Sequence, residues 1–294
     1  MRAVTDRTRL PGDRRRPAHR ATQPNRVVLP SRPHPSAAAQ WWTLTARLLR
    51  PSLRNGEVLT AVLAPTVFTL GFYVPMNAVM AAYGHGLSSY AQFLLPMIVM
   101  QAVAFCAVSA AHRAAVDARA GLDERLRTLP LPRLVPPAAR LAAALYRGGI
   151  AGAGALVCGG VIGARFFGPW WQTGGFLLLA LAVGAVLSLG ADLLGSLSAG
   201  PEATTQLLAL PQLILGLVST GLAPAEHFPP WLAGFAAHQP VSAFVDALRA
   251  LAGDATGAAG TIGWSTLGPA VAWILGLAAV FGAGAVFVAS RGGR

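Results

Sequence analysis

The sequence predicts an all-α membrane protein with six transmembrane helices, and three features lead to that fold class. Hydrophobic residues make up 54% of the 294 residues and charged residues only 12%, whereas soluble domains are about 25% charged. The longest run without a charged side chain, Leu59–Ala111, can hold two spans of about 20 residues each. The 23 basic residues, all of them arginine, gather on one side of the predicted topology.

Two segments precede the first predicted span. Residues 1–40 are rich in arginine and proline and poor in apolar residues, which predicts a disordered cytoplasmic tail because so little apolar surface cannot offset the entropy of ordering. The tail also lacks the apolar core and cleavage site of a secretion signal. From Trp41 onward, tryptophan and leucine share one helical face and arginine another, which predicts an interfacial elbow helix that Pro51 ends or kinks. An ordinary helix flanking the first span is the alternative.

Residues 41–294 form the predicted membrane domain. Glycine and serine between residues 81 and 89 divide the long apolar run, and polar loops separate the later apolar runs. The predicted spans lie at about 59–80, 90–111, 141–163, 173–195, 207–224 and 266–289.

The positions of the arginines give the orientation, because cytoplasmic loops are enriched in basic residues. With both termini inside, twenty of the 23 arginines are cytoplasmic and only Arg165 and Arg249 lie in outer loops. The net charge of +12 therefore indicates attraction to anionic lipid and not to nucleic acid, since the arginines lie in a tail and in loops beside the membrane. The sequence predicts a multi-pass protein of the cell membrane.

The polar segment between the second and third spans contains a predicted amphipathic helix. Apolar residues recur there at helical spacing, and a Pro-Leu-Pro run ends the helix. Such a helix suits a groove on a soluble partner, and a solvated connector between two spans is the alternative. The residues expected to carry the contact are Leu122, Asp123, Glu124, Arg125, Leu126 and Arg127.

A long segment, Ala225–Ser265, precedes the last span. From Val241 its apolar positions form a helical stripe of about twelve residues, roughly 18 Å, which is too short to cross a hydrocarbon core of about 30 Å. We expect short re-entrant or interfacial helices that cap the outer end of a cargo path; a lid that only packs is the alternative. The candidate residues of this segment are Glu226, Trp231, Asp246 and Arg249.

Three polar side chains stand out inside the predicted spans. Arg147 lies six residues into the third span, and Asp192 lies about four residues before the end of the fourth, so their depths are similar. Because charges within a membrane generally face a bundle interior or an aqueous path, we expect the two to pair near the inner mouth. A purely structural ion pair, or an arginine that reaches the headgroups, is the alternative. Gln101, in the middle of the second span, bridges helices by hydrogen bonds or contacts cargo.

The composition also excludes several kinds of chemistry. Because the chain has no lysine, it has neither a phosphate-binding P-loop nor a Schiff-base lysine. Cys106 and Cys158 form no CxxC pair, and the six histidines lack the spacing of metal ligands. We therefore expect no catalytic residue, bound cofactor or metal in this chain.

Two motifs carry a family resemblance. The run Gly121–Arg133 resembles the cytoplasmic motif of ABC-2 type transport permeases, and Ser219–Leu251 resembles the segment before the last span of the same family. Within that family, Pro51–Thr60 and Gly184–Gly195 are similar to the B-type permease of actinobacterial daunorubicin and phthiocerol-dimycocerosate exporters. The resemblance covers roughly residues 41–290.

The resemblance implies the permease subunit of an ATP-driven exporter of amphiphilic drugs or complex lipids, as in drug efflux and antibiotic resistance. It also implies two copies of a soluble ATP-binding subunit, which hold ATP and Mg²⁺, a second permease chain, and residues 113–129 as the coupling helix. Two other classes stay open. A polytopic membrane transferase would use Glu226, His227 or His238, and an ion-coupled secondary transporter would need carboxylates near the midplane.

Overall fold

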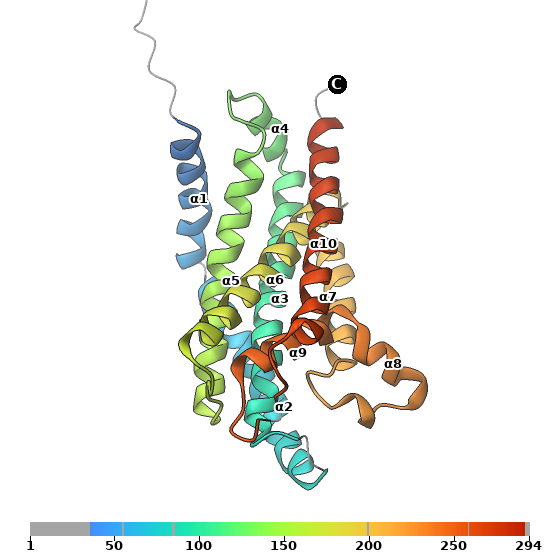
Figure 1. Ribbon diagram of the computed structural model, residues 1–294. Coiled ribbons are helices and arrows are strands. Elements are labelled where there is room, and N and C mark those ends of the chain that lie inside the picture. The colour runs from blue at the N-terminus through green and yellow to red at the C-terminus, as the bar shows by residue number, and fades with distance from the viewer. Residues whose placement is uncertain (1–35, 55, 84–85, 199, 258, 292–294) are drawn as a thin grey trace, which may run out of the picture. The chain divides into compact units, whose positions relative to one another are not determined.

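The computed structural model describes residues 36–54, 56–83, 86–198, 200–257 and 259–291, and these form a bundle of long helices (Figure 1). The helices are α1 (Ala37–Arg54), α2 (Glu57–Tyr83), α3 (Tyr90–Arg119), α4 (Leu122–Arg127), α5 (Val135–Val161), α6 (Trp170–Leu197), α7 (Pro201–Leu217), the 3-10 turn η1 (Ala225–His227), α8 (Pro230–His238), α9 (Pro240–Ala252) and α10 (Trp264–Arg291). No strand occurs within these ranges, in agreement with the predicted all-α class. The predicted disordered tail lies outside the described residues except for its last five.

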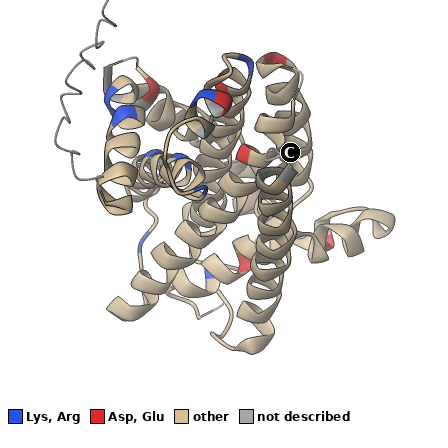
Figure 2. Cartoon of the chain, turned by 90° about the horizontal axis from the view of Figure 1, so that it is seen from above, with Lys and Arg blue, Asp and Glu red and all other residues tan. Residues whose placement is uncertain are grey.

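The bundle has two ends that differ in content. Helix α4, the start of α1 and the end of α10 lie at one end, called here the α4 end (Figure 1). Helices α8 and α9 lie toward the other, called here the α9 end, together with the loops before α3 and after α5. Viewed onto the α4 end, the helices carry few charged residues along most of their length (Figure 2). A membrane-spanning bundle has this distribution, because a charged side chain facing lipid is costly.

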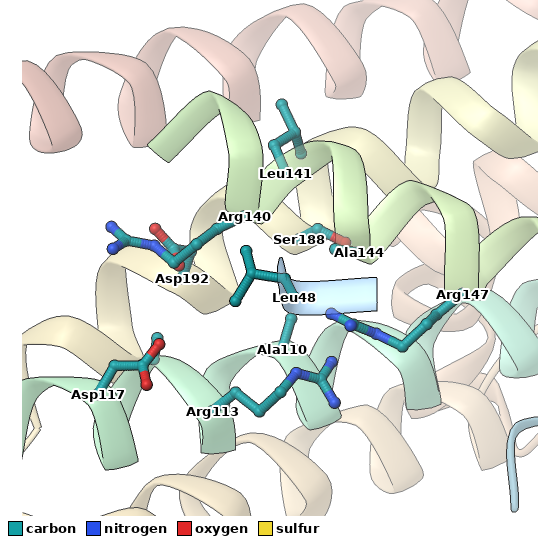
Figure 3. A pocket seen from close by; sticks show the side chains of 11 residues that line it. Leu48, Ala110, Arg113, Asp117, Arg140, Leu141, Ala144, Arg147, Ser188 and Asp192 are labelled. Atoms are coloured by element: carbon teal, nitrogen blue, oxygen red, sulfur yellow. The ribbon is translucent and has the colours of Figure 1, made fainter. Parts of the chain in front are cut away.

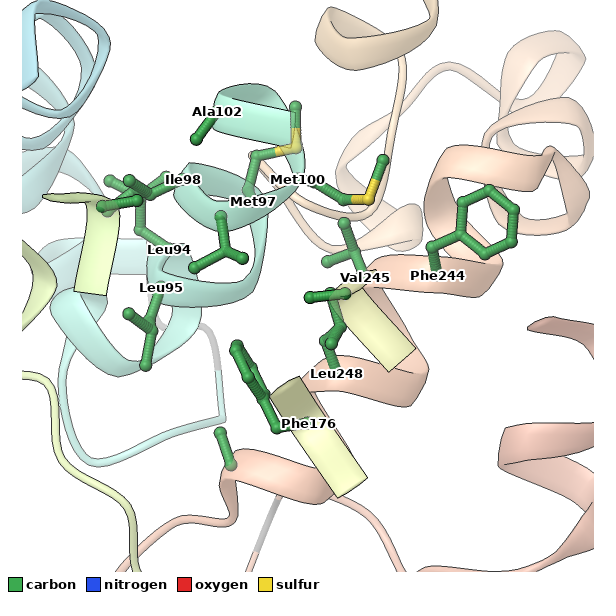
Figure 4. Packing of buried hydrophobic residues seen from close by; sticks show 14 of the residues in the cluster. Leu94, Leu95, Met97, Ile98, Met100, Ala102, Phe176, Phe244, Val245 and Leu248 are labelled. Carbon is green, nitrogen blue, oxygen red and sulfur yellow. The ribbon is translucent and has the colours of Figure 1, made fainter. Parts of the chain in front are cut away.

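Helix α3 is the central element. It packs against α2, α5, α6, α7 and α9, and most of its length is buried. Its apolar residues surround the whole helix rather than one face, which is the pattern of a buried helix. Near its start, Leu94, Met97 and Ile98 pack with Phe176 of α6 and Leu248 of α9 (Figure 4). The main core therefore lies where α3, α6 and α9 meet.

Five described helices are long and apolar enough to cross a membrane. These candidate spans are Leu59–Ala82, Tyr90–Arg119, Val135–Val161, Trp170–Leu197 and Trp264–Val288. They coincide with predicted spans one to four and six, although the second and third extend further at the α4 end. The helix at the predicted fifth span, α7, begins six residues earlier than expected and has 17 residues, about 25 Å. The count of six spans stays a prediction.

Contacts place α7 antiparallel to α3. His112 Nδ1 lies 3.2 Å from Thr205 Oγ1 near one end of the pair, and Ser219 Oγ donates to Met97 Sδ at 3.8 Å near the other. Fifteen residues of α3 separate these contacts, which corresponds to about 22 Å along its axis. Helix α7 stops at Leu217 because Val218 leaves the helical region, with φ −93° and ψ 33°. The segment after it turns back toward α9.

The predicted elbow helix is present as α1, which packs mainly along α5. Pro51 lies inside α1, and the helix continues one turn beyond it to Arg54. The location of α1 at a membrane surface stays a prediction.

Polar side chains fasten the α9 end. Gln92 is buried at the start of α3, where its amide donates to the carbonyls of Arg165 (2.9 Å) and Gly253 (2.6 Å) and accepts from Arg165 N (3.0 Å). One side chain therefore joins α3 to the loop after α5 and to the loop after α9. Sequence analysis missed this residue; its only signal was a polar side chain within an apolar run, one turn after the N-cap Ser89.

Candidate functional site

The α4 end presents the short helix α4 on the end of α3. Helix α3 continues unbroken to Arg119, and α4 contains only six residues. The prediction of a single helix over residues 113–129 is therefore wrong. The break comes at Gly121, whose φ of 65° lies in the left-handed region that glycine adopts without steric cost. The preceding stretch is rich in alanine and contains no glycine or proline, so nothing ends α3 earlier.

Helix α4 exposes charge at this end. Glu124 and Arg125 are exposed, whereas Leu122 and Leu126 are half-buried, and α4 packs against α3. The hydroxyl of Thr128 donates to the carbonyl of Arg125 at 2.8 Å and closes the helix. The side chains of Asp123 and Arg127 lie outside the described residues. The predicted contact surface thus exposes one acidic and one basic side chain, Glu124 and Arg125.

A small pocket, open on one side, lies between α1, α3, α5 and α6 (Figure 3). Its lining is rich in charge for a helical bundle. The lining residues are Leu48, Ala110, Arg113, Ala114, Asp117, Arg140, Leu141, Ala144, Arg147, Ser188 and Asp192. Both members of the predicted inner-mouth pair, Arg147 and Asp192, are among them.

The structure gives Asp192 a different partner from the predicted one. Arg140 Nε lies 2.7 Å from Asp192 Oδ1, and Arg147 forms no ion pair with Asp192. The predicted depth of Arg147 was counted from residue 141, but α5 already begins at Val135. Arg147 is therefore twelve residues into its helix, whereas Asp192 is only five residues from the end of α6. Arg140, two turns earlier on α5, is the arginine level with Asp192.

Arg147 lies instead beside Arg113, whose own partner is Glu57. Arg113 Nη1 donates to Glu57 Oε2 at 3.1 Å, and the hydroxyl of Ser52 donates to the same oxygen at 2.6 Å. Burial alone raises the pKa of the Glu57 carboxyl, but the Ser52 hydrogen bond and the charge of Arg113 outweigh burial and lower the pKa below its ordinary value. Glu57 is therefore ionised at neutral pH. Sequence analysis missed Glu57, Arg113 and Arg140, because all three lie just outside the apolar runs that defined the spans.

Gln101 bridges two helices. Its Oε1 accepts a hydrogen bond from Gln212 Nε2 of α7 at 3.2 Å, and Gln101 is buried. The structure supports the helix-bridging interpretation of this residue. Such a bond between polar side chains strengthens the association of two membrane helices, where apolar surfaces alone are already solvated by lipid.

Two of the predicted outer residues, Asp246 and Arg249, hold α9 in place. Arg249 Nη1 lies 2.7 Å from Asp246 Oδ1, and its Nη2 donates to the carbonyl of Thr220 at 2.9 Å. The guanidinium also lies over the ring of Phe93, with Cζ 4.2 Å from the ring centroid. The Thr220 hydroxyl donates to Asp246 at 3.0 Å. This cluster ties α9 to the turn after α7 and to the start of α3.

The other two predicted outer residues lie apart from this cluster. Glu226 is exposed on η1, and Trp231 is 80% exposed on α8. Helix α8 contacts η1 and α9 and extends sideways from the bundle (Figure 1). The predicted short helices before the last span are therefore present, but their four candidate residues do not form one site.

Among the described residues, no group of three His, Cys, Asp or Glu side chains gathers to hold a metal ion. The described residues thus include an exposed helix with charged side chains, α4, and a pocket lined by charged residues between α1, α3, α5 and α6.

Comparisons with known proteins identify relatives of the chain. The family model for the ABC-2 type transporter matches residues 39–252. The doxorubicin resistance ABC transporter permease protein DrrB of Mycobacterium tuberculosis, found in two strains, is 41% identical over 261 residues, which cover 87% of this chain and 90% of DrrB. The daunorubicin resistance ABC transporter permease protein DrrB1 of Streptomyces coeruleorubidus is 26% identical over 228 residues, 76% of each chain.

Proposed function

Since the chain belongs to the ABC-2 type transporter family, which provides the membrane subunits of ABC transporters rather than their ATPases, we propose that this permease exports amphiphilic drugs or complex lipids, driven by ATP hydrolysis in a separate partner. The names of its relatives support a drug as cargo, since DrrB and DrrB1 are doxorubicin and daunorubicin resistance permeases. The chain lacks lysine and therefore a P-loop of its own, so its energy must come from a partner.

The observation that carries this proposal is helix α4. A short helix at one end of the bundle, with Glu124 and Arg125 exposed, is suited to dock in a groove of a soluble ATPase. Two ATP-binding subunits, holding ATP and Mg²⁺, would dock on two permease chains, identical or related. Movement of α4 would then bias the bundle between two conformations, because a partner can shift an equilibrium only through differential contacts with the two states.

In this proposal the α4 end is cytoplasmic, together with both chain termini. Impermeant thiol reagents added to intact cells test the orientation, after Cys106 and Cys158 are replaced by serine. A cysteine in place of Glu226 should react from outside, whereas one in place of Arg125 should react only after the cells are opened. Reaction at position 125 in intact cells would contradict the orientation.

The docking role is tested with the chain and its ATPase copurified and reconstituted in lipid vesicles. Reversing the exposed charge on α4 (Glu124→Arg) should reduce assembly and cargo-stimulated ATP hydrolysis about tenfold or more, because it places like charges across a fitted interface. The matched control is Glu226→Arg, the same reversal at an exposed site of the α9 end. Equal activity of the two variants would show that α4 is not the docking element.

The two alternatives gain less from the structure. Asp192, the carboxylate that a secondary transporter would use, is paired with Arg140 and lies near the end of α6. Of the residues considered for a transferase, Glu226 is exposed, and the His238 ring lies 2.9 Å from the carbonyl of Gly234 within its own helix. Transport by the purified chain alone, driven by a proton gradient, would reverse the preference.

A further inference from the structure

Two arginines converge on the pocket from antiparallel helices. Side chains tilt toward the N-terminus of their helix. The N-terminus of α5 lies at the α4 end, so Arg147 leans toward that end, and α3 runs the opposite way, so Arg113 leans toward the middle of the bundle. The two guanidinium groups point toward one another, while Asp117, Arg140 and Asp192 occupy the other side of the pocket (Figure 3).

The described residues do not fill the hydrogen-bonding capacity of these two guanidinium groups. Within the described part of the chain, the Arg147 side chain has no ion pair or hydrogen bond, although the residue is only 6% exposed. Its Nε and the Nη2 of Arg113 are buried without a partner there. Glu57 is the one described carboxylate that attracts Arg147, and its Oε2 is already shared by Ser52 and Arg113. The Asp117 carboxylate, which lines the same pocket, also attracts Arg113, so what the described residues do not supply is hydrogen-bond acceptors for these buried nitrogens, and a buried charged group without such partners is costly.

We infer that the pocket between Arg113 and Arg147 binds one phosphate-type oxyanion, in the form of the phosphodiester of a phospholipid in the adjacent leaflet. A phosphodiester has anionic oxygens that accept charge-assisted hydrogen bonds from such nitrogens. Guanidinium nitrogens match phosphate oxygens in a fork that lysine cannot reproduce, and the orphaned nitrogens are of this kind.

The depth of the site fits a headgroup. Arg113 is the first charged residue after the uncharged run Leu59–Ala111, which places it at the edge of the hydrocarbon core, next to a headgroup zone about 5–8 Å thick. Ala110, three residues from Arg113 toward the middle of the bundle, and Leu48 of α1 add apolar lining to the pocket. The inference depends on the proposed function in one respect only: the proposed orientation makes the leaflet at the α4 end the inner leaflet.

Binding is measured on the full-length chain in detergent by native mass spectrometry and thermal unfolding. The probes are phosphatidylglycerol, a diacylglycerol with the same acyl chains but no phosphate, and inorganic phosphate. Phosphatidylglycerol should bind and raise the unfolding temperature, and the diacylglycerol should not. Arg147→Gln should weaken phosphatidylglycerol binding about tenfold or more, because a charge-assisted hydrogen bond is lost. Arg147→Lys, which keeps the charge without the fork, should lie between the two and serves if the glutamine variant fails to fold.

The matched control is Arg165→Gln, which removes an arginine at the α9 end whose Nη1 already donates to the carbonyls of Gly160 and Ala164. It should bind phosphatidylglycerol like the wild type. Equal binding of phosphatidylglycerol and the diacylglycerol, or unchanged affinity in Arg147→Gln, would overturn the inference. Stabilisation by inorganic phosphate alone, lost in Arg147→Gln, would keep the oxyanion site and overturn the lipid as its source. None of these measurements needs the ATPase, so a failure here is separate from a failure of the α4 docking test.

Discussion

Two buried arginines, one at each end of the bundle, have opposite surroundings. Arg249 at the α9 end is paired with Asp246, donates to a backbone carbonyl and lies over the Phe93 ring. Arg147 at the α4 end is only 6% exposed, yet within the described residues the charged groups that act on it are another arginine, Arg113, and the shared carboxylate of Glu57. Protein groups bind the guanidinium of Arg249 at one end, whereas Nε of Arg147 at the other end has no hydrogen-bond partner among the described residues.

The difference indicates a division of labour. At the α9 end, Gln92 and Arg249 tie α3, the loop after α5 and the segment around α9 into one unit. Such a satisfied polar network makes a region rigid. At the α4 end, helix α4 exposes Glu124 and Arg125, and the pocket holds buried nitrogens of Arg113 and Arg147 that have no hydrogen-bond partner among the described residues. An exporter needs this asymmetry, because the end that receives a partner and a ligand must be able to change its contacts.

The largest expected effect comes from removing the paired arginine. Arg249→Met removes the charged donor to the Thr220 carbonyl, the cation–π contact with Phe93 and the ion partner of the partly exposed Asp246, which together should cost about 3 kcal/mol of stability. Arg147→Met at the other end should be neutral or stabilising without phospholipid, because it removes a buried charge that no described group pairs. Thermal unfolding of both variants in phosphate-free detergent measures the contrast. Equal losses of stability would show that the two ends are not different in this respect.

Glycine packing gives the next largest effect, this time at the α4 end. A Cβ on Gly195 of α6 would overlap the carbonyl oxygen of Ala111 and lie 2.9 Å from Ala114 Cβ, both on α3. Gly195→Ala should therefore push the two helices apart and cost about 2 kcal/mol. Gly148→Ala on α5 is the matched control, because a Cβ there meets nothing within 4 Å. Unfolding temperatures of the two variants check the prediction, and a stable Gly195→Ala would place α6 further from α3.

Apolar runs in the sequence predicted well those helices whose whole length is apolar. The outer helix expected from Val241 is α9, Pro240–Ala252, and the last span expected at 266–289 is α10, Trp264–Arg291. The predicted bounds were least accurate where a helix extends from an apolar run into polar sequence. Helix α5 includes Arg140, which marked the end of a polar loop in the sequence, so the pairing of Asp192 was assigned to the wrong arginine.

The candidate site was only partly predictable for a related reason. Position in a span indicates that Arg147 is buried, but not which side chains of other helices stand beside it. Arg113 and Glu57 are 56 residues apart in the chain and meet only because α2 and α3 pack together. A charge count by loops places both residues at the cytoplasmic side and says nothing about their contact.

The smallest expected effect is a pH dependence at the α9 end. The Asp254 carboxylate accepts hydrogen bonds from the backbone N–H groups of Ser88 (3.1 Å) and Thr256 (2.9 Å) and from both hydroxyls. Burial alone raises the pKa of the Asp254 carboxyl, but the hydrogen bonds from Ser88 and Thr256 outweigh burial and lower the pKa below its ordinary value. The stabilisation is therefore full above the unfolded-state pKa, about 3.9, and is lost as pH falls through the lower folded-state pKa.

Asp254→Asn should lower stability at pH 7 by about 1 kcal/mol, because an amide group turned toward these N–H donors cannot accept from all of them. The gap between wild type and variant in unfolding temperature should narrow as the pH falls below about 4 and close below the lower folded-state pKa, where the wild-type carboxyl is also neutral. Glu57 at the α4 end also has a lowered pKa, so both proteins should lose stability in acid and only the gap between them reports on Asp254. A gap that stays constant down to pH 2 would mean that the ionised carboxylate does not hold the loop before α3 to the loop after α9.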